Sequence, residues 1–139
     1  VEKYIGKWYE IARLDSRFEK NLNQTTAEYS LDENGKIIVK NRGYNFKKNK
    51  WESVQGKAKF AKNKNLGDLK VSFFGPFYAP YKIIQLDSSY KYALVSSGKD
   101  YLWILSREKS IPENIKNQYL NYAKTLNYNT KNLIWVEHK

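Results

Sequence analysis

The chain has 139 residues, with 25 Lys and Arg against 14 Asp and Glu, no Cys and a single His, His138. The absence of cysteine excludes disulfides, thiol nucleophiles and Cys-ligated metal sites, and one histidine argues against a His-centred triad or a multi-His metal site. This length fits a single domain over residues 1–139, and the 16% aromatic content is too high for a disordered chain. Composition therefore leaves a binding protein, or an enzyme that works with carboxylates and tyrosines.

The net charge of +11 is concentrated in one segment. Residues 36–64 contain ten basic residues and one acidic residue, Glu52. Such a segment suits nucleic acid, an anionic membrane or an anionic ligand, and it equally suits a solvated face that keeps the protein in solution. No run of apolar residues is long enough to predict a membrane-spanning helix.

Short runs of alternating apolar and polar residues, separated by turn residues, predict β-strands. One of the turns contains Asn34-Gly35, a strong hairpin signal. The runs cover residues 7–14, 26–31, 36–45, 51–61, 68–74, 81–86, 92–96 and 101–106. Their even spacing and adjacent hairpins predict an all-β fold, an eight-stranded up-and-down antiparallel barrel.

The pattern changes near the C-terminus, where apolar residues recur at helical spacing. These residues are Ile115, Tyr119, Tyr122 and Leu126. They predict one α-helix over residues 112–125, packed on the outside of the barrel. Ser110 and Glu113 have the spacing of a capping box, and Pro112 fits the first helical turn. A short final strand is expected at residues 133–136.

No motif in the chain predicts catalysis. The carboxylates of Glu10, Asp15, Glu19 and Glu28 are scattered, and no glycine-rich motif forms a phosphate-binding loop. The serines lack a histidine that would activate them. We therefore expect a protein that is not an enzyme, with no catalytic residue, no cofactor and no metal site.

The inward face of the predicted barrel is apolar and aromatic, which suits a hydrophobic ligand because an eight-stranded barrel can hold one small molecule. The residues expected to contact the ligand are Tyr29, Val39, Asn41, Gly56, Ala58, Phe60, Val71, Phe73, Tyr78, Tyr81, Trp103 and Leu105. Leu31 and Val54 share this inward face by strand alternation. The alternative is that these side chains simply pack against one another.

A nucleic-acid partner is the alternative from a different class. Tyr44, Phe46 and Trp51 lie among basic residues, as in proteins that stack single-stranded nucleic acid. However, only four of the 25 basic residues are Arg, and neither an RNP-like nor a helix-turn-helix pattern is present. We expect no nucleic-acid partner, and a single-strand-binding barrel remains the alternative.

Three motifs resemble the lipocalin family, and they occur in the family's order and with its spacing. Gly6-Lys7-Trp8 resembles the Gly-x-Trp signature of the first strand, and residues 86–95 resemble the second motif, with Leu86-Asp87 where many members have Thr-Asp. Residues 103–107 resemble the third motif, which ends in an arginine. The resemblance covers residues 4–137 and is greatest to bacterial outer-membrane lipocalins.

The resemblance implies a barrel closed at one end by a structural clamp of Gly6, Trp8 and Arg107, with the guanidinium lying across the indole. It also implies that the cavity binds fatty acids and lysophospholipids for transport or storage. A tetrapyrrole or an isoprenoid is the alternative ligand. We expect a location on the periplasmic side of the outer membrane, with a lipid anchor on the full-length precursor.

The resemblance places residues 15–24, 47–50 and 75–80 at the open end of the barrel. Lys47, Lys48 and Lys50 would then attract the anionic head group of a lipid that enters the cavity. Phe77 and Tyr78 either contact a membrane surface or a second copy in a homodimer, or fold inward over the cavity. Glu10 either faces the cavity or pairs with Arg13 or Arg42.

Overall fold

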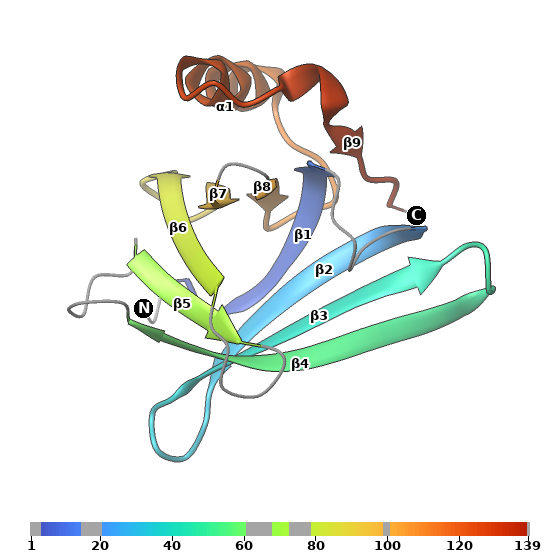
Figure 1. Ribbon diagram of the computed structural model, residues 1–139, viewed down its shortest axis with the longest axis vertical. Helices are drawn as coiled ribbons and strands as arrows, with labels where there is room; N and C mark the ends of the chain where they lie inside the picture. Colours follow the sequence, from blue (N-terminus) through green and yellow to red (C-terminus); the bar gives the residue numbers. More distant parts are fainter. Residues whose placement is uncertain (1–3, 15–20, 61–67, 73–78, 99–100, 139) are drawn as a thin grey trace.

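A closed antiparallel barrel is the main feature of the computed structural model, which describes residues 4–14, 21–60, 68–72, 79–98 and 101–138 (Figure 1). Each strand pairs with its neighbour in sequence, and β1 pairs with both β8 and β2, which closes the sheet on itself. The strands are β1 (Gly6–Arg13), β2 (Leu22–Leu31), β3 (Ile37–Asn45), β4 (Lys50–Phe60), β5 (Asp68–Ser72), β6 (Ala79–Leu86), β7 (Tyr92–Ser97) and β8 (Tyr101–Ser106). The predicted eight-stranded up-and-down barrel is therefore confirmed.

The C-terminal segment packs on the outside of the barrel. Helix α1 (Glu113–Thr125) lies above β7 and β8 in Figure 1, and a 3-10 turn, η2 (Thr130–Asn132), leads from it to the two-residue strand β9 (Ile134–Trp135). Strand β9 pairs with the end of β1, and the backbone N–H of Gln24 donates a hydrogen bond to the carbonyl of Glu137. The C-terminal segment thus covers the point where β2 diverges from β1.

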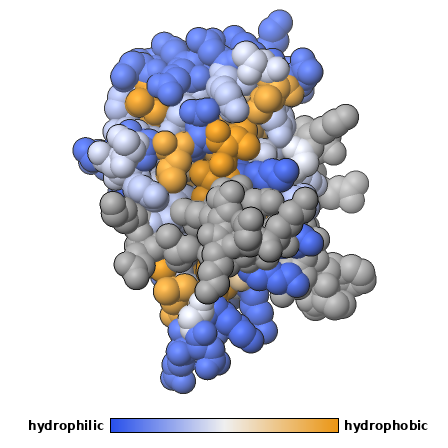
Figure 2. Space-filling model, turned by 90° about the vertical axis from the view of Figure 1, so that its left-hand side faces the viewer, coloured by the Kyte–Doolittle hydropathy of each residue, from blue (hydrophilic) through white to orange (hydrophobic). Residues whose placement is uncertain are grey.

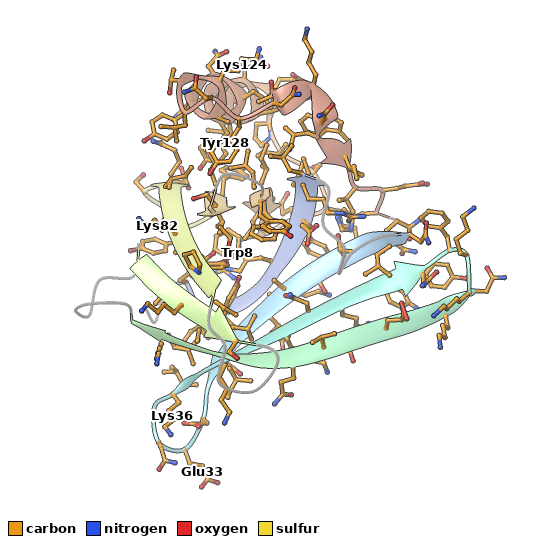
Figure 3. All side chains as sticks on the ribbon, viewed as in Figure 1. Trp8, Glu33, Lys36, Lys82, Lys124 and Tyr128 are labelled. Atoms are coloured by element: carbon orange, nitrogen blue, oxygen red, sulfur yellow. The ribbon has the colours of Figure 1, made fainter. Side chains whose placement is uncertain are left out.

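Two apolar clusters stabilise the fold, one inside the barrel and one between the barrel and the C-terminal helix. The first lies inside the barrel and includes the fully buried Trp8, shown among the strands in Figure 3. The second lies between the barrel wall and α1, where Tyr119 and Ala123 pack against Ile104 and Leu94. A β-bulge between Glu10 and Ala12 in β1 changes the strand's alternation, so that consecutive residues there are buried.

The expected capping box at the start of α1 is wrong. The N-cap is Pro112, in an extended conformation and without a side-chain capping bond, so the helix begins at Glu113. The carbonyl of Ser110 instead accepts a hydrogen bond from the Ser106 hydroxyl. Ser110 therefore lies two residues before the N-cap, too early for its side chain to cap the first turn.

Three residues expected to face the core are exposed, and one of them, Val54 of β4, is 45% exposed although it lines the cavity described below. Leu126, the last residue of the predicted helical stripe, is 44% exposed because it is the C-cap of α1. Leu31 is also 44% exposed, since it is the last residue of β2 before the turn into β3. Alternation and helical spacing predict which way a side chain faces, but they do not show where a strand or helix ends and its side chains become exposed to solvent.

Within the described residues, none of the helices is long and apolar enough to cross a membrane.

Candidate functional site

The barrel encloses a cavity of about 410 Å³ that is lined by side chains from all eight strands. The lining from β5 to β8 is mainly apolar and aromatic, with hydroxyl groups among its members: Val71, Pro80, Tyr81, Val95, Ser97, Tyr101, Trp103 and Leu105. The lining from β1 to β4 has more polar groups among its apolar ones: Glu10, Thr25, Tyr29, Asn41, Arg42, Glu52 and Ser53. A cavity of this composition suits a largely apolar ligand with a limited number of polar atoms.

The structure brings seven of the predicted ligand-contacting residues together around this cavity. These are Tyr29, Val39, Asn41, Val71, Tyr81, Trp103 and Leu105. Gly56 and Ala58 are buried on β4 but do not line the cavity, and Ala58 packs into the cluster inside the barrel. The side chain of Phe60, and the residues Phe73 and Tyr78, lie outside the described residues. The contacts of all these residues with a ligand stay a prediction.

Three tyrosine hydroxyls meet at the inner end of the cavity. The Tyr81 hydroxyl is hydrogen-bonded to that of Tyr29, and it lies 3.0 Å from that of Tyr4. Burial raises the pKa of each of the three phenols well above its ordinary value. The hydroxyls therefore stay protonated across the physiological pH range and give the inner end of the cavity neutral hydrogen-bonding groups.

Glu10 lines the cavity and forms a buried ion pair with Arg13. Their charged atoms, Glu10 Oε1 and Arg13 Nη1, are 3.4 Å apart, and both side chains are almost fully buried. Arg13 Nη2 also donates a hydrogen bond to the carbonyl of Leu22. Both alternatives proposed for Glu10 from sequence thus apply at once, since it faces the cavity and pairs with Arg13. The pairing balances the negative charge that Glu10 brings to the cavity wall.

The closed end is built around Trp8 and Arg107. The Arg107 guanidinium carbon lies 3.9 Å from the centroid of the Trp8 ring. The same guanidinium donates hydrogen bonds of 3.0–3.2 Å to backbone carbonyls of Tyr4, Ile5, Lys7 and Tyr90.

Gly6 makes room for this arrangement. It has a φ of +113°, and a Cβ placed there would lie 3.1 Å from Arg107 Nη1. A larger residue would therefore be strained in its backbone and would press on the guanidinium. Gly6, Trp8 and Arg107 form one packed unit, and none of the three lines the cavity.

Among the described residues, the start of β2 and the β3–β4 hairpin lie at the end of the barrel opposite Trp8, which we call the open end. Lys47, Lys48 and Lys50 are exposed on the turn of that hairpin. Beside the turn, Gly43 lies so close to β2 that a Cβ there would be 2.8 Å from Thr25 Cγ2 and 3.1 Å from Leu22 Cδ1. The cavity wall at the open end therefore depends on a close approach between two backbones.

Several residues at this open end were missed by the sequence analysis. Leu22, Thr25, Gly43, Glu52, Ser53 and Ser97 line the cavity without having been predicted to do so. Strand β2 begins four residues before the predicted run because a bulge near Gln24, which has a φ of +51°, interrupts its alternation. In the sequence, only the presence of a glycine, Gly43, inside the alternating run at 36–45 indicated that another backbone comes close to this strand.

Among the described residues, no group of side chains has the composition of a metal site.

Comparisons with known proteins give a consistent result. A family model described as a lipocalin-like domain matches residues 1–138. The outer membrane lipoprotein Blc of Citrobacter freundii is 47% identical over 138 residues, which cover 99% of this chain and 78% of that protein. Apolipoprotein D of Rattus norvegicus is 39% identical over 137 residues, covering 91% of this chain and 70% of that protein. Among solved structures, lobster apocrustacyanin A1 has a TM-score of 0.81 at 20% identity, covering 99% of this chain and 79% of that one.

Proposed function

Because the chain belongs to the lipocalin family, we propose that its barrel binds the acyl chains of fatty acids and lysophospholipids and transports or stores these lipids. The family supports the binding of a small hydrophobic ligand and a carrier role without catalysis. The observation that carries the proposal is the enclosed cavity, whose wall is mostly apolar and ends in neutral hydroxyls. Each methylene buried there contributes about 0.8 kcal/mol, so the acyl chain supplies most of the affinity.

The lysines of the β3–β4 turn have a separate part in this proposal. Lys47, Lys48 and Lys50 are exposed beside the open end, where they attract an anionic head group during approach. Their effect is on the association rate and its salt dependence, because exposed charges are screened by salt.

The bacterial relative at 47% identity is named an outer membrane lipoprotein, which supports an association of this chain with the outer membrane. We place its action on the periplasmic side, with a lipid anchor on the full-length precursor.

Extraction of the purified protein with organic solvent, followed by mass spectrometry, tests the ligand class directly. We expect fatty acids or lysophospholipids, and we expect added fatty acid to quench the fluorescence of Trp103, which lines the cavity. A Trp103→Phe variant should lose most of the quenching, whereas Trp135→Phe, which changes an exposed indole on β9, should retain it. Recovery of a tetrapyrrole or an isoprenoid, or the absence of both bound lipid and quenching, would contradict the proposal.

Stopped-flow binding tests the role of the lysines. Replacing Lys47, Lys48 and Lys50 with Gln should slow fatty-acid association and flatten its dependence on salt. The matched control replaces Lys36, Lys40 and Lys124, which are also exposed but lie away from this turn. An unchanged association rate in the first variant, or equal slowing in both, would show that the turn does not steer the ligand.

A further inference from the structure

The tip of the β3–β4 hairpin, residues 42–52, presents both apolar rings and positive charge to solvent. Phe46 is 48% exposed and Trp51 is 45% exposed, although large aromatic side chains are usually buried. The tip also carries four exposed cationic side chains. These are Arg42, Lys47, Lys48 and Lys50.

The tip is held in one shape by its own hydrogen bonds. The buried Asn45 accepts bonds from the backbone N–H groups of Lys47 and Lys48 through Oδ1, and it donates one from Nδ2 to Glu52. The backbone N–H of Phe46 donates to the carbonyl of Asn21 at the start of β2. A preformed surface loses little conformational entropy when it binds a partner.

The charge of the tip is not balanced locally. Its single acidic residue, Glu52, is hydrogen-bonded to Asn45. Among the described residues, no acidic side chain forms an ion pair with Lys47, Lys48 or Lys50. The three ammonium groups are therefore available to an anionic partner.

The tip lies at the open end, and the opposite end of the same strands is different in character. Arg42, Gly43 and Glu52 line the cavity, so the tip borders the route by which a ligand enters. At the other end of β3, the β2–β3 turn is hydrophilic and carries Glu33 and Lys36 at its far point (Figures 2 and 3). Aromatic rings and unpaired cations are thus combined at the cavity entrance and not at the other tip.

We propose that the hairpin tip is a docking surface for a lipid bilayer that contains anionic lipid. Phe46 and Trp51 lie at the level of the head groups, where aromatic rings partition favourably, and the lysines contact phosphate groups. The docked barrel presents its open end to the bilayer, so a lipid passes between membrane and cavity without crossing bulk water. This proposal concerns the outer surface and goes beyond ligand binding in the cavity.

The chemistry of the tip favours a membrane over a nucleic acid or a second copy of the chain. Its single arginine, Arg42, lies over the Trp51 ring at 4.1 Å and so occupies a face on which a base would stack. The remaining cations are lysines, which contact phosphate as point charges and read no base. Two tips of the same positive charge would repel each other, which disfavours a symmetric contact through this surface.

Sedimentation with vesicles tests the proposal. We expect the protein to bind phosphatidylcholine vesicles containing phosphatidylglycerol, to bind phosphatidylcholine alone far more weakly, and to dissociate as salt is raised. A Lys47→Glu/Lys48→Glu variant should bind at least about tenfold more weakly, since each lysine near an anionic surface adds roughly a factor of five. Brominated phospholipid should quench the native protein, and a Trp51→Phe variant should lose that quenching.

Matched variants at the opposite end are the controls. Lys36→Glu/Lys40→Glu makes the same change in net charge as the Lys47/Lys48 variant. Leu31→Ser removes an apolar side chain of similar exposure to Phe46, and it is the control for Phe46→Ser, which should weaken vesicle binding. Both controls should bind vesicles as the native protein does. Equal weakening by the Lys36/Lys40 variant would overturn the proposal, because it would show that only net charge matters.

Three further results would also overturn it: unchanged binding by the Lys47/Lys48 variant, tighter binding to single-stranded RNA than to vesicles at physiological salt, and a dimer that Phe46→Ser dissociates. Binding of a soluble fatty acid is measured on the same variants at equilibrium. Failure of the docking surface leaves that affinity intact, whereas failure of the cavity function abolishes it in the native protein.

Discussion

The same contact, an arginine guanidinium over a tryptophan ring, occurs at both ends of the barrel at nearly the same distance. Arg107 lies 3.9 Å from the Trp8 ring at the closed end, and Arg42 lies 4.1 Å from the Trp51 ring at the open end. Trp8 is fully buried, whereas Trp51 is 45% exposed. The two pairs therefore have similar distances and very different surroundings.

The comparison shows that the burial of the ring, and not the contact itself, decides how much an arginine–tryptophan pair contributes to stability. A cation over an aromatic ring contributes about 0.5–1 kcal/mol when exposed and about 2 kcal/mol or more when desolvated. Arg107 also donates to backbone carbonyls from two separate segments, so it ties the N-terminal segment to the β6–β7 turn. At the closed end the ring is part of the core and the partly buried guanidinium covers it, whereas the open-end pair leaves an aromatic ring and positive charge available at the surface.

The largest expected difference in stability between the two ends is the one between Trp8→Ala and Trp51→Ala. Trp8→Ala should lower the free energy of unfolding by about 3–5 kcal/mol, because it leaves a cavity among Tyr4, Tyr29 and Leu105. Trp51→Ala should lower it by about 1 kcal/mol or less, since its ring is half exposed. Urea denaturation measures both. Near-normal stability of Trp8→Ala would contradict its assignment to the closed-end core.

The next largest effect comes from exchanging the two arginines for lysine. Arg107→Lys keeps the charge but loses the planar fork, so we expect a loss of about 2–3 kcal/mol as backbone carbonyls lose their donors. Arg42→Lys should change stability by about 0.5 kcal/mol or less. Thermal and urea unfolding of both variants check the comparison. Equal losses would mean that the ring contact, which the two share, is the main stabilising element.

The fold was predictable because most strands follow simple alternation. The run at 101–106 coincides with β8, and the run at 36–45 exceeds β3 by one residue, because each has an apolar inner face and a turn at both ends. The start of β2 was not predictable, because positive φ values at Asn21 and Gln24 break the alternation there. Local backbone geometry of this kind depends on tertiary contacts, such as the hydrogen bond from Gln24 to Glu137.

The cavity was predictable in its middle and not at its open end. Val39, Val71 and Leu105 follow from strand parity, and the structure places all three along the cavity. Thr25 and Gly43 face each other across a bulged pairing, and parity fails at a bulge. The tyrosine cluster also required the structure, since Tyr4 and Tyr81 are 77 residues apart in sequence.

A smaller effect is expected from Gly43→Ala at the open end. The added methyl group would lie 2.8 Å from Thr25 Cγ2, so β2 and β3 must separate slightly, at a cost of about 1–2 kcal/mol. Because Leu22, Thr25 and Gly43 all line the cavity, we also expect the association rate of a fatty acid to change. Stopped-flow binding and urea denaturation measure the two effects. Unchanged values in both would show that the open end accommodates the methyl group freely, unlike the closed end.

The smallest effect, about 1.4 kcal/mol, concerns the pH dependence of stability at the closed end. Burial raises the pKa of Tyr29 well above 10.0, the ordinary value that it regains on unfolding. Its contribution to stability is therefore complete below pH 10 and is lost as the pH rises toward the folded-state pKa, since the unfolded chain releases the proton first. One pH unit above the ordinary value, this loss amounts to about 1.4 kcal/mol for a single phenol, and Tyr29→Phe should reduce the alkaline loss of stability by about that amount. Urea denaturation of both proteins at about pH 9 and about pH 11 measures the difference. Parallel alkaline losses in the two proteins would show that Tyr29 is not held in its protonated form at the inner end of the cavity.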